Sequence, residues 1–385
     1  MADTPERVVF VTGYPGFIGK RLVRRLAEQG RGRERIFVLV QKKHLAAAAA
    51  DLESMAGELG GARVEVIEGD VEQMHLGLSG VEWKSLAAEV TDLWHLASVS
   101  RLEADRRQIR HVNVEGTRNV IELAQHARRL SRLNHFSSSY VSGDRVGVIL
   151  EDELAMGQRF HNAYEESKYQ AELLVRRVMG DLPATVYRPS IVVGDSRTGE
   201  IDRFEGPYAM AILLVASPVG VPLPLPGDAL APLNVVPVDF VVDAVTSIAR
   251  NPAGAGRTVH VVDPSPLSAR RVYEMIAARA GKKIPEVSIP ARAFEAVMRL
   301  PGLERLARGH RVALEYVNHL AIYNCRHLLE LLEGTAIQCP PITDYLDRLM
   351  EFVQATFARR REHEAALDVD DPLDPAPPSD PGAAG

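Results

Sequence analysis

Two rhythms of apolar and polar residues alternate along the first 200 positions of the chain. Short apolar runs are typical of strands buried in a parallel sheet, and the longer segments between them have the period of connecting helices. This alternation predicts an α/β fold with a doubly wound parallel sheet. The predicted strands are Val8–Thr12, Ile36–Val40, Arg63–Glu68, Asp92–Leu96, Arg132–Ser137 and Thr185–Arg188.

Beyond about residue 190 the pattern loosens, and Pro- and Gly-rich loops separate shorter elements. Val235–Val242 and Thr258–Val262 still have the pattern of strands. We therefore expect one strand and one helix from residues 230–262 to return to the sheet. Residues Arg292–Tyr345 are mostly helical in pattern.

These shifts predict an N-terminal domain over residues 1–200 and a small C-terminal lobe formed mainly by residues 201–360. Within the lobe, Tyr208–Gly227 is uncharged and mostly apolar, but its four prolines argue against a membrane-spanning helix. We therefore expect no transmembrane segment. Residues 364–385 are acidic, Pro-rich and free of aromatic residues, which predicts a disordered tail.

The composition is that of an ordinary globular protein with a formal net charge of -6. This acidic balance argues against nucleic acid as the main partner. Cys325 and Cys339 are the two cysteines, and their spacing is not that of metal ligands, so we expect no metal site. The N-terminus lacks the basic and apolar regions of a signal peptide, and together with so few cysteines this predicts a cytoplasmic protein.

A glycine-rich loop is the strongest chemical signal. Gly13, Gly16 and Gly19 lie between the first predicted strand and an amphipathic helix. Glycines at these places permit a tight turn, a close approach of the backbone to a pyrophosphate, and close packing of helix on strand. The helix N-terminus then presents free N–H groups and a positive dipole end to phosphates. The loop therefore predicts a dinucleotide-binding site.

The type of dinucleotide is indicated at the end of the second predicted strand, where an acidic residue would hold the ribose hydroxyl of NAD. Gln41, Lys42, Lys43 and His44 follow this strand, so no carboxylate is present and two ammonium groups could meet a 2′-phosphate. This favours NADPH over NADH as the cofactor. Asp70 follows the third strand, where it could accept a hydrogen bond from the adenine amino group or serve as a loop or cap residue.

A candidate catalytic pair lies on the next strongly helical segment. Tyr164 and Lys168 are four residues apart, so they share one helix face. A cation one turn away, with the positive nicotinamide ring, should lower the pKa of the phenol from its usual value near 10 toward the working range. Phe136–Ser139 ends the fifth predicted strand, where a serine hydroxyl could hold a carbonyl oxygen in the ligand crevice.

With these residues in view, the chain resembles the extended short-chain dehydrogenase/reductases from Val8 to about Phe357. RPSIVVGDSRTGEIDRFEGPY and CPPITDYLDRLMEFV are most similar to the branch that contains fatty acyl-CoA reductases and thioester-reductase domains. The motifs that carry the resemblance are Thr12-Gly13-Tyr14-Pro15-Gly16-Phe17-Ile18-Gly19, His95-Leu96-Ala97, Asn113-Val114-Glu115-Gly116-Thr117, Ser137-Ser138-Ser139-Tyr140-Val141-Ser142-Gly143, Tyr164 with Lys168, and Tyr187-Arg188-Pro189-Ser190.

The resemblance implies a role for each matching residue. Tyr164 would be the general acid, and Lys168 would hold the nicotinamide ribose and lower the pKa of Tyr164. Ser138 would orient the substrate carbonyl, with Ser139 as a lesser candidate. Asn113 would either assist a proton relay or have a structural role in its helix.

The resemblance also implies a set of residues around the cofactor, with Pro189 and Ser190 against the nicotinamide carboxamide. The chain departs from the branch at Gln41, where an arginine is usual, so the preference for NADPH depends on the neighbouring lysines. The predicted cofactor-binding residues are Gly13, Tyr14, Pro15, Gly16, Phe17, Ile18, Gly19, Lys42, Lys43, Asp70, Val71, Leu96, Ala97, Tyr164, Lys168, Pro189 and Ser190.

The function implied is hydride transfer from NADPH to a carbonyl or acyl thioester, with the C-terminal lobe binding the substrate. The uncharged segment Tyr208–Gly227 suggests a lipidic acyl group. Two alternatives stay open: a nucleotide-sugar epimerase or dehydratase, or a hydroxysteroid-type dehydrogenase, on the same fold, and a non-catalytic NAD(P)-binding sensor. The intact set of Ser138, Tyr164 and Lys168 counts against a sensor. Peripheral membrane contact and a homodimer also stay open.

Overall fold

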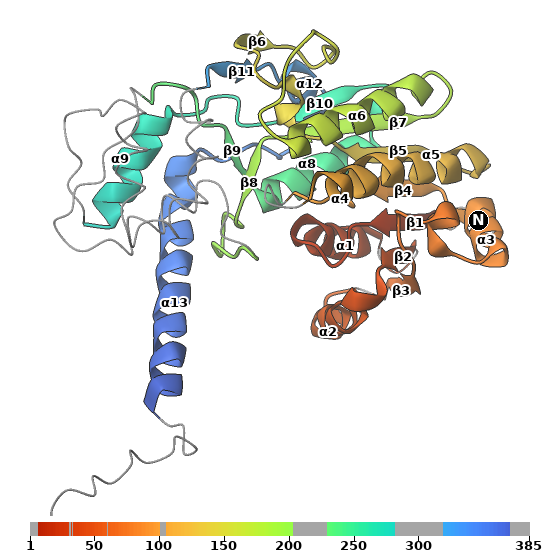
Figure 1. Ribbon diagram of the computed structural model, residues 1–385, viewed down its shortest axis with the longest axis horizontal. Helices are drawn as coiled ribbons and strands as arrows, with labels where there is room; N and C mark the ends of the chain where they lie inside the picture. The colour runs from red at the N-terminus through yellow and green to blue at the C-terminus, as the bar shows by residue number, and fades with distance from the viewer. Residues whose placement is uncertain are drawn as a thin grey trace, which may run out of the picture.

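A computed structural model of the chain describes residues 7–30, 32, 34–59, 61–100, 105–202, 229–281 and 319–369. Its centre is a seven-stranded sheet in which every neighbouring pair of strands is parallel (Figure 1). The six strands predicted in the first 200 residues are all present, which confirms the predicted Rossmann-type doubly wound sheet. In spatial order the strands are β3 (Arg63–Glu68), β2 (Glu34–Val40), β1 (Arg7–Thr12), β4 (Asp92–His95), β5 (Arg132–Phe136), β7 (Ala184–Pro189) and β10 (Thr258–Val261).

The chain reverses its direction of travel across the sheet between β1 and β4. In a doubly wound sheet this switch point, at the carboxyl ends of the strands, is where ligands bind. The last residue of β1, Thr12, is in register with His95 at the end of β4. Phe136, at the end of β5, is in register with Tyr187 near the end of β7. The loops that follow these strands therefore emerge at one edge of the sheet.

Two layers of helices cover the sheet and bury its near-continuous apolar strands (Figure 1). The rings of Trp94 and Tyr187 stack on one face with centroids 6.2 Å apart. On that face pack α1 (Phe17–Gly30), α2 (Leu45–Met55), α8 (Val238–Arg250) and α12 (Arg326–Leu332). On the other side lie α3 (Gly80–Glu89), α4 (Arg106–Arg110), α5 (Gly116–His126) and α6 (Ala163–Val178).

A smaller second core forms the C-terminal lobe, beside the sheet (Figure 1). It joins α9 (Ala269–Arg279) and α13 (Ile342–Val369) to a two-stranded parallel ribbon of β8 (Ile191–Val193) and β9 (Val235–Pro237). A second ribbon pairs β6 (Gly147–Ile149) with β11 (Ala321–Tyr323). None of the described helices is long and apolar enough to cross a membrane.

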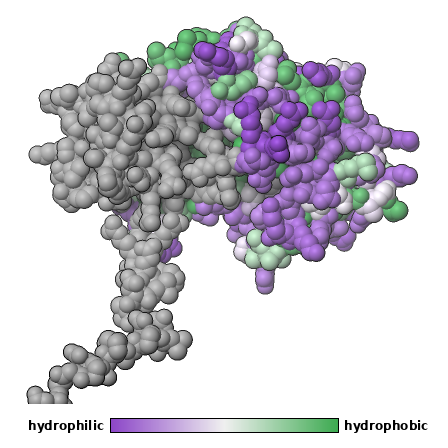
Figure 2. Space-filling view, in the orientation of Figure 1, coloured by the Kyte–Doolittle hydropathy of each residue, from purple (hydrophilic) through white to green (hydrophobic). Residues whose placement is uncertain are grey.

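The outer side of the β6–β11 ribbon is apolar. Val148 of β6 and Ile322 of β11 are exposed, and so are Val146 and Leu320, which directly precede the two strands. Figure 2 shows a largely hydrophilic face over the sheet, with green atoms gathered at the upper rim where Figure 1 draws β6 and β11.

Three predictions need correction. The apolar run Val235–Val242 is a strand only as far as Pro237, because from Val238 its apolar residues follow the helical period of α8, which has Asp239 in its first turn. The segment predicted to be mostly helical contains strand β11.

The predicted disordered tail begins too early, because α13 extends to Val369 through a run rich in Ala, Arg and Glu, which favour helix. Residues 370–385, Tyr208–Gly227 and residues 292–318 lie outside the described part of the chain.

Candidate active site

The two candidate catalytic residues lie in the first two turns of α6. The side chain of Asn162 caps this helix by accepting a hydrogen bond from the backbone N–H of Glu165 at 3.0 Å. Tyr164 is half-buried and Lys168 is buried one turn later. The Lys168 Nζ donates to the carbonyl oxygen of Phe136 at 2.5 Å. This bond fixes α6 to the carboxyl end of β5.

Burial sets the protonation of both side chains. It raises the pKa of Tyr164 to about 12, although a hydrogen bond with Ser138 lowers it in part. In the protein alone, burial therefore outweighs the contacts that favour the phenolate, and the predicted lowering of this pKa by Lys168 and the nicotinamide ring together stays a prediction. Burial lowers the pKa of Lys168 to about 8, while the carboxylate of Glu172 raises it. At neutral pH Tyr164 thus holds its proton and Lys168 is charged.

The three serines after β5 have different partners. Ser137 donates its hydroxyl to Glu172 Oε2 at 2.6 Å, so its side chain is turned into the protein. Ser138 accepts from the backbone N–H of Tyr140 at 3.2 Å and is hydrogen-bonded to Tyr164. Among these hydroxyls Ser138 is therefore placed beside the phenol, as the sequence predicts.

Asn113 is held by structural contacts. It lies in a π-helical turn (His111–Glu115) between α4 and α5 and is buried. Its amide nitrogen donates to the Val99 carbonyl at 3.1 Å and to Ser167 Oγ at 2.8 Å. Its side-chain oxygen accepts from the Val99 N–H at 2.8 Å. These bonds support the structural role, since they connect the loop after β4 to α6.

A chain of hydrogen bonds that the sequence did not reveal runs beneath the switch point. Burial lowers the pKa of His95 to about 3, so its ring is neutral. Thr117 donates its hydroxyl to the Asn113 carbonyl at 2.6 Å, so it accepts from His95 Nε2 at 2.9 Å. The other ring nitrogen, Nδ1, then accepts from the Thr12 hydroxyl at 2.8 Å. The chain thus joins the end of β1 to the π-helical turn.

The glycine loop has room for backbone alone. Gly13 has a φ of +89°, and a Cβ there would lie 2.7 Å from the backbone N of Ala97. A Cβ on Gly16 or Gly19 would lie 2.8 or 2.5 Å from the Gly13 carbonyl oxygen. The loop therefore packs against the Leu96–Ala97 segment and exposes the N-terminus of α1, which fits a dinucleotide pyrophosphate.

The side chain of Tyr14 points away from this loop toward α2. It is buried, and its hydroxyl donates to Asp51 Oδ2 at 2.5 Å. Among the predicted loop residues, Tyr14 can therefore contribute its backbone to the cofactor site, while its ring fixes the loop to α2.

The predicted 2′-phosphate site is more open. Lys42 and Lys43 lie in a short 3-10 helix (Lys42–His44) after β2, and both are exposed. Neither has an ion-pair partner among the residues that the structure describes. Asp70 accepts from Gln41 Nε2 at 2.8 Å and from the Glu72 N–H at 3.0 Å. These contacts show that Asp70 stabilises the loop, and its predicted bond to the adenine amino group stays a prediction.

The predicted nicotinamide contacts lie at the carboxyl end of β7. Pro189 ends the strand, and the Ser190 N–H donates to the Val261 carbonyl at 3.2 Å. The Ser190 hydroxyl is buried and has no partner in the described part of the chain. A buried hydroxyl of this kind fits a contact with the cofactor carboxamide.

Sequence reasoning also missed Glu172, which is four residues beyond Lys168 and completely buried. The signal was its spacing, because residues at i and i+4 share a helix face. Its partners are Ser137, directly after β5, and Arg188 on β7, which are 35 and 16 residues away in the chain, and only the fold brings them together.

Comparison with known proteins identifies the family of the chain. Residues 11–245 match the NAD-binding family described as "Male sterility protein". The fatty acyl-CoA reductase wat of Drosophila melanogaster is 27% identical over 292 residues, covering 64% of this chain and 55% of its own length. The nonribosomal peptide synthetase asaC of Aspergillus flavus is 27% identical over 284 residues, covering 68% of this chain and 26% of its own. The chain therefore spans little more than half of the first relative and about a quarter of the second.

A solved structure extends the similarity to nearly the whole chain. The terminal R domain from the myxalamid PKS-NRPS biosynthetic pathway is 25% identical, with a TM-score of 0.77, and the match covers 91% of each chain.

Proposed function

The chain belongs to the male sterility protein family, and from that premise we propose that it is an NADPH-dependent reductase of acyl thioesters and the corresponding aldehydes. The single observation that supports the proposal is that Tyr164 is hydrogen-bonded to Ser138 and Lys168 to Phe136, at the carboxyl edge of the sheet from which the glycine loop after β1 also emerges. A fatty acyl-CoA reductase and a nonribosomal peptide synthetase among the relatives support a thioester substrate.

Each residue has a chemical task at the reacting carbonyl. Ser138 donates to the carbonyl oxygen and orients it, while Tyr164 gives its proton to that oxygen as the C=O bond becomes a single bond. NADPH, when bound, supplies the hydride that the carbon receives. Lys168, charged at neutral pH, holds the ribose and stabilises the phenolate that Tyr164 becomes. For a thioester, the resulting hemithioacetal loses the thiol and leaves the aldehyde.

NADPH is the preferred cofactor in this proposal because of Lys42 and Lys43, which are exposed and unpaired by acids in the described part of the chain. The ammonium groups of Lys42 and Lys43, beyond β2, would attract the 2′-phosphate of NADPH. NADH has no such phosphate, so the preference for NADPH comes from this added attraction and not from repulsion of NADH. We further propose a cytoplasmic enzyme, from the low cysteine content.

We propose a lipidic acyl chain, supported by the name of the Drosophila relative and by the uncharged segment Tyr208–Gly227. Burying each methylene contributes up to about 0.8 kcal/mol, so catalytic efficiency should rise by up to a few-fold per methylene until the pocket is full. Equal efficiency for short and long acyl chains would remove the lipid from the proposal and leave the reductase.

The test is NADPH oxidation by the purified protein against acyl-CoAs, fatty aldehydes, ketones and nucleotide-sugars. The proposal predicts oxidation with acyl-CoAs and aldehydes and none with nucleotide-sugars. Turnover of nucleotide-sugars without net oxidation of the cofactor would instead establish an epimerase or dehydratase. Binding of NADPH without turnover of any of these substrates would favour a sensor.

A further inference from the structure

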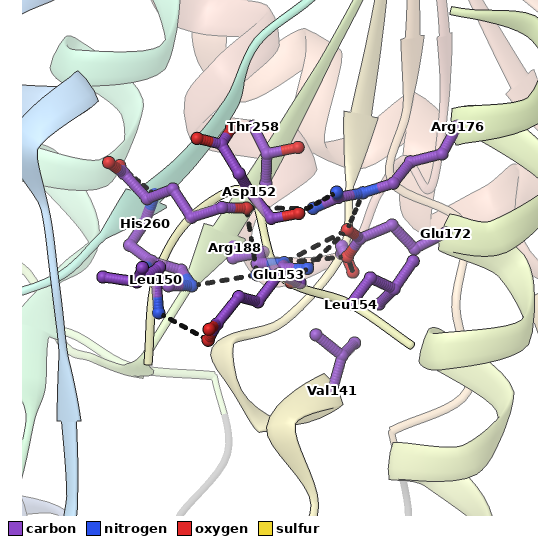
Figure 3. A network of polar contacts seen from close by, with 12 residues as sticks. Val141, Leu150, Asp152, Glu153, Leu154, Glu172, Arg176, Arg188, Thr258 and His260 are labelled. Carbon is purple, nitrogen blue, oxygen red and sulfur yellow. Dashed lines mark hydrogen bonds and ion pairs between the residues drawn. The ribbon is translucent and has the colours of Figure 1, made fainter. Parts of the chain in front are cut away.

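A buried ionic network lies behind the candidate catalytic pair (Figure 3). At its centre Glu172, completely buried, accepts from Ser137 Oγ through Oε2 at 2.6 Å. Its Oε1 accepts from Arg188 Nη2 at 2.7 Å and from Arg176 Nε at 2.9 Å. One carboxylate thereby connects the end of β5, the end of β7 and the middle of α6.

The two arginines carry the network onward to the backbone of the loop before α6. Arg176 donates to the carbonyl oxygens of Asp152 at 2.7 Å and Glu151 at 2.9 Å. Arg188 donates to the carbonyl of Glu153 at 2.7 Å. Figure 3 shows Asp152 and Glu153 of this loop next to the side chains of the two arginines.

Burying such a network costs free energy, because each ion loses its hydration and the attraction between the ions offsets that loss only in part. The carboxylate of Glu172 faces three cations, Arg176, Arg188 and Lys168, and burial keeps His260 next to Arg188 neutral by lowering its pKa to about 3. Stabilisation of the fold is therefore a weak explanation for a buried cluster with this many cations, and a role in function is the better one.

We propose that Glu172 is a positioning residue of the candidate active site, which fixes the residues that touch substrate and cofactor and keeps Lys168 charged. This inference rests on the proposed reductase function. Ser137, which Glu172 binds, directly precedes Ser138, and Arg188, which it also binds, directly precedes Pro189. Lys168 lies one helical turn before it, so the two Cβ atoms are neighbours on one face of α6.

The charge on Lys168 depends on few groups. Tyr164 and Glu172 face it from α6, His135 faces it from β5 and His95 from β4. Burial lowers the pKa of both histidines far below neutrality, so neither adds charge there. Tyr164 is protonated below pH about 12. Within the described residues, the negative charge that raises the pKa of Lys168 is therefore that of Glu172.

Loss of the Glu172 carboxylate should lower the pKa of Lys168. Burial has already lowered the pKa of Lys168 to about 8, and Glu172 opposes that shift. Removing the carboxylate in Glu172→Gln should lower the pKa by about one further unit or more. Lys168 would then lose its charge near neutral pH, and the alkaline limb of the kcat profile should move to lower pH by the same amount.

Nuclear magnetic resonance of ¹³Cε-labelled lysine measures this directly in the full chain and needs no substrate. The seven lysines give a small set of signals, and Lys168→Met identifies the one from Lys168. The matched control is Glu166→Gln, which removes a carboxylate on the same helix that pairs with Arg106 at the surface. The lysines are Lys20, Lys42, Lys43, Lys84, Lys168, Lys282 and Lys283.

We expect Lys168 to titrate near 8 in the natural protein and in Glu166→Gln, lower in Glu172→Gln, and near 8 again in Glu172→Asp, which restores the charge. If Glu172→Gln leaves the Lys168 titration in place, or Glu172→Asp behaves like Glu172→Gln, the charge-setting role is wrong. If Glu172→Gln does not fold, the double variant Glu172→Gln/Arg188→Met is used in the same titration. It removes the carboxylate of Glu172 together with the guanidinium that would otherwise be left buried without its partner.

A second variant separates position from charge. Ser137→Ala keeps the carboxylate of Glu172 and removes its hydrogen bond to the residue after β5. Lys168 should therefore titrate as in the natural protein. Because one hydrogen bond to a charged group is lost, kcat should fall about tenfold with KM little changed. An unchanged kcat would overturn the positioning role. If no carbonyl compound is turned over but the Lys168 titration shifts as expected, the reductase proposal fails while the link between Glu172 and Lys168 stands.

Discussion

The two ends of the sheet differ in how far their strands and charged side chains are buried. At the β3 end, four of the six strand residues are exposed, and the lysines proposed to meet the cofactor lie on the surface. Toward the other end, all six residues of β7, the strand next to the edge strand β10, are buried, and Lys168, Glu172 and Arg188 have their charges inside the protein. We propose that the two sides have different roles: the side from β1 to β3 binds the nucleotide through backbone and surface charge, and the side of β5 and β7 fixes the reacting groups.

The largest effect on folding should come from the buried end. Glu172→Gln leaves Arg188 buried without its carboxylate, and breaking a buried ion pair in this way costs about 3–5 kcal/mol. Urea denaturation of the variant and the natural protein measures the difference. A loss below about 1 kcal/mol would show that the network is hydrated enough to behave like a surface pair, and the comparison between the two ends would fail.

The largest effect on turnover should come from Tyr164→Phe, which removes the proposed general acid. Turnover should fall about a hundredfold or more while NADPH affinity stays nearly unchanged, since the ring remains. Tyr169→Phe is the matched control, because this tyrosine lies on the same helix and packs on Phe160 with ring centroids 5.0 Å apart. Turnover within a few-fold of the natural protein would remove Tyr164 from the mechanism.

Gly19→Ala should be the next largest change. Its Cβ would lie 2.5 Å from the Gly13 carbonyl oxygen, so the loop must shift, at a cost of about 1–3 kcal/mol. Cofactor affinity, measured by calorimetry, should fall by about tenfold or more. Gly80→Ala is the control, since a Cβ there meets nothing within 4 Å. Equal behaviour of the two variants would mean that the loop does not contact the cofactor.

At the open end, Lys42→Ala combined with Lys43→Ala should weaken NADPH binding about tenfold and leave NADH almost unaffected. A charge-assisted contact is worth about 1.5–3 kcal/mol, and exposure to solvent brings the effect toward the lower figure. Equal losses for both cofactors would indicate general damage to the site. No loss for either would show that the lysines are solvated and that NADP preference lies elsewhere.

The smallest effect should come from an ion pair at the same open end. Glu89 accepts from Arg35 Nη1 at 2.8 Å, with both side chains partly exposed. Glu89→Gln should change the free energy of unfolding by less than about 1 kcal/mol in the same urea experiment as Glu172→Gln. A cost comparable to that of Glu172→Gln would erase the proposed contrast between surface and buried pairs.

The sequence predicted the sheet and located the glycine loop and the candidate catalytic pair, because each depends on a local pattern. The glycine loop, the six strands and the Tyr164–Lys168 pair are each contained in a stretch of fewer than twenty residues. Val238–Val242 was placed in a strand because β-branched residues suit strands, and the helical period appears only over the full length of α8.

What the sequence could not give depends on contacts between distant segments. The bond of Glu172 to Ser137 and Arg188 and the chain from Thr12 through His95 to Thr117 exist only once the strands are assembled. The sequence shows the cation that, with the nicotinamide ring, is predicted to lower the pKa of Tyr164, but it does not show how deeply the phenol is buried. Burial, which raises this pKa to about 12, is a property of the fold.

The central claim is hydride transfer to a carbonyl carbon with Tyr164 as the proton donor, and deuterium labelling tests it most directly. NADPH carrying deuterium at the transferable position of its nicotinamide ring is incubated with the protein and a long-chain acyl-CoA, and the product is analysed by mass spectrometry. We predict deuterium on the former carbonyl carbon of the aldehyde or alcohol, and a rate at least about a hundredfold lower with Tyr164→Phe. Product without deuterium, or equal rates for the two proteins, would contradict the account.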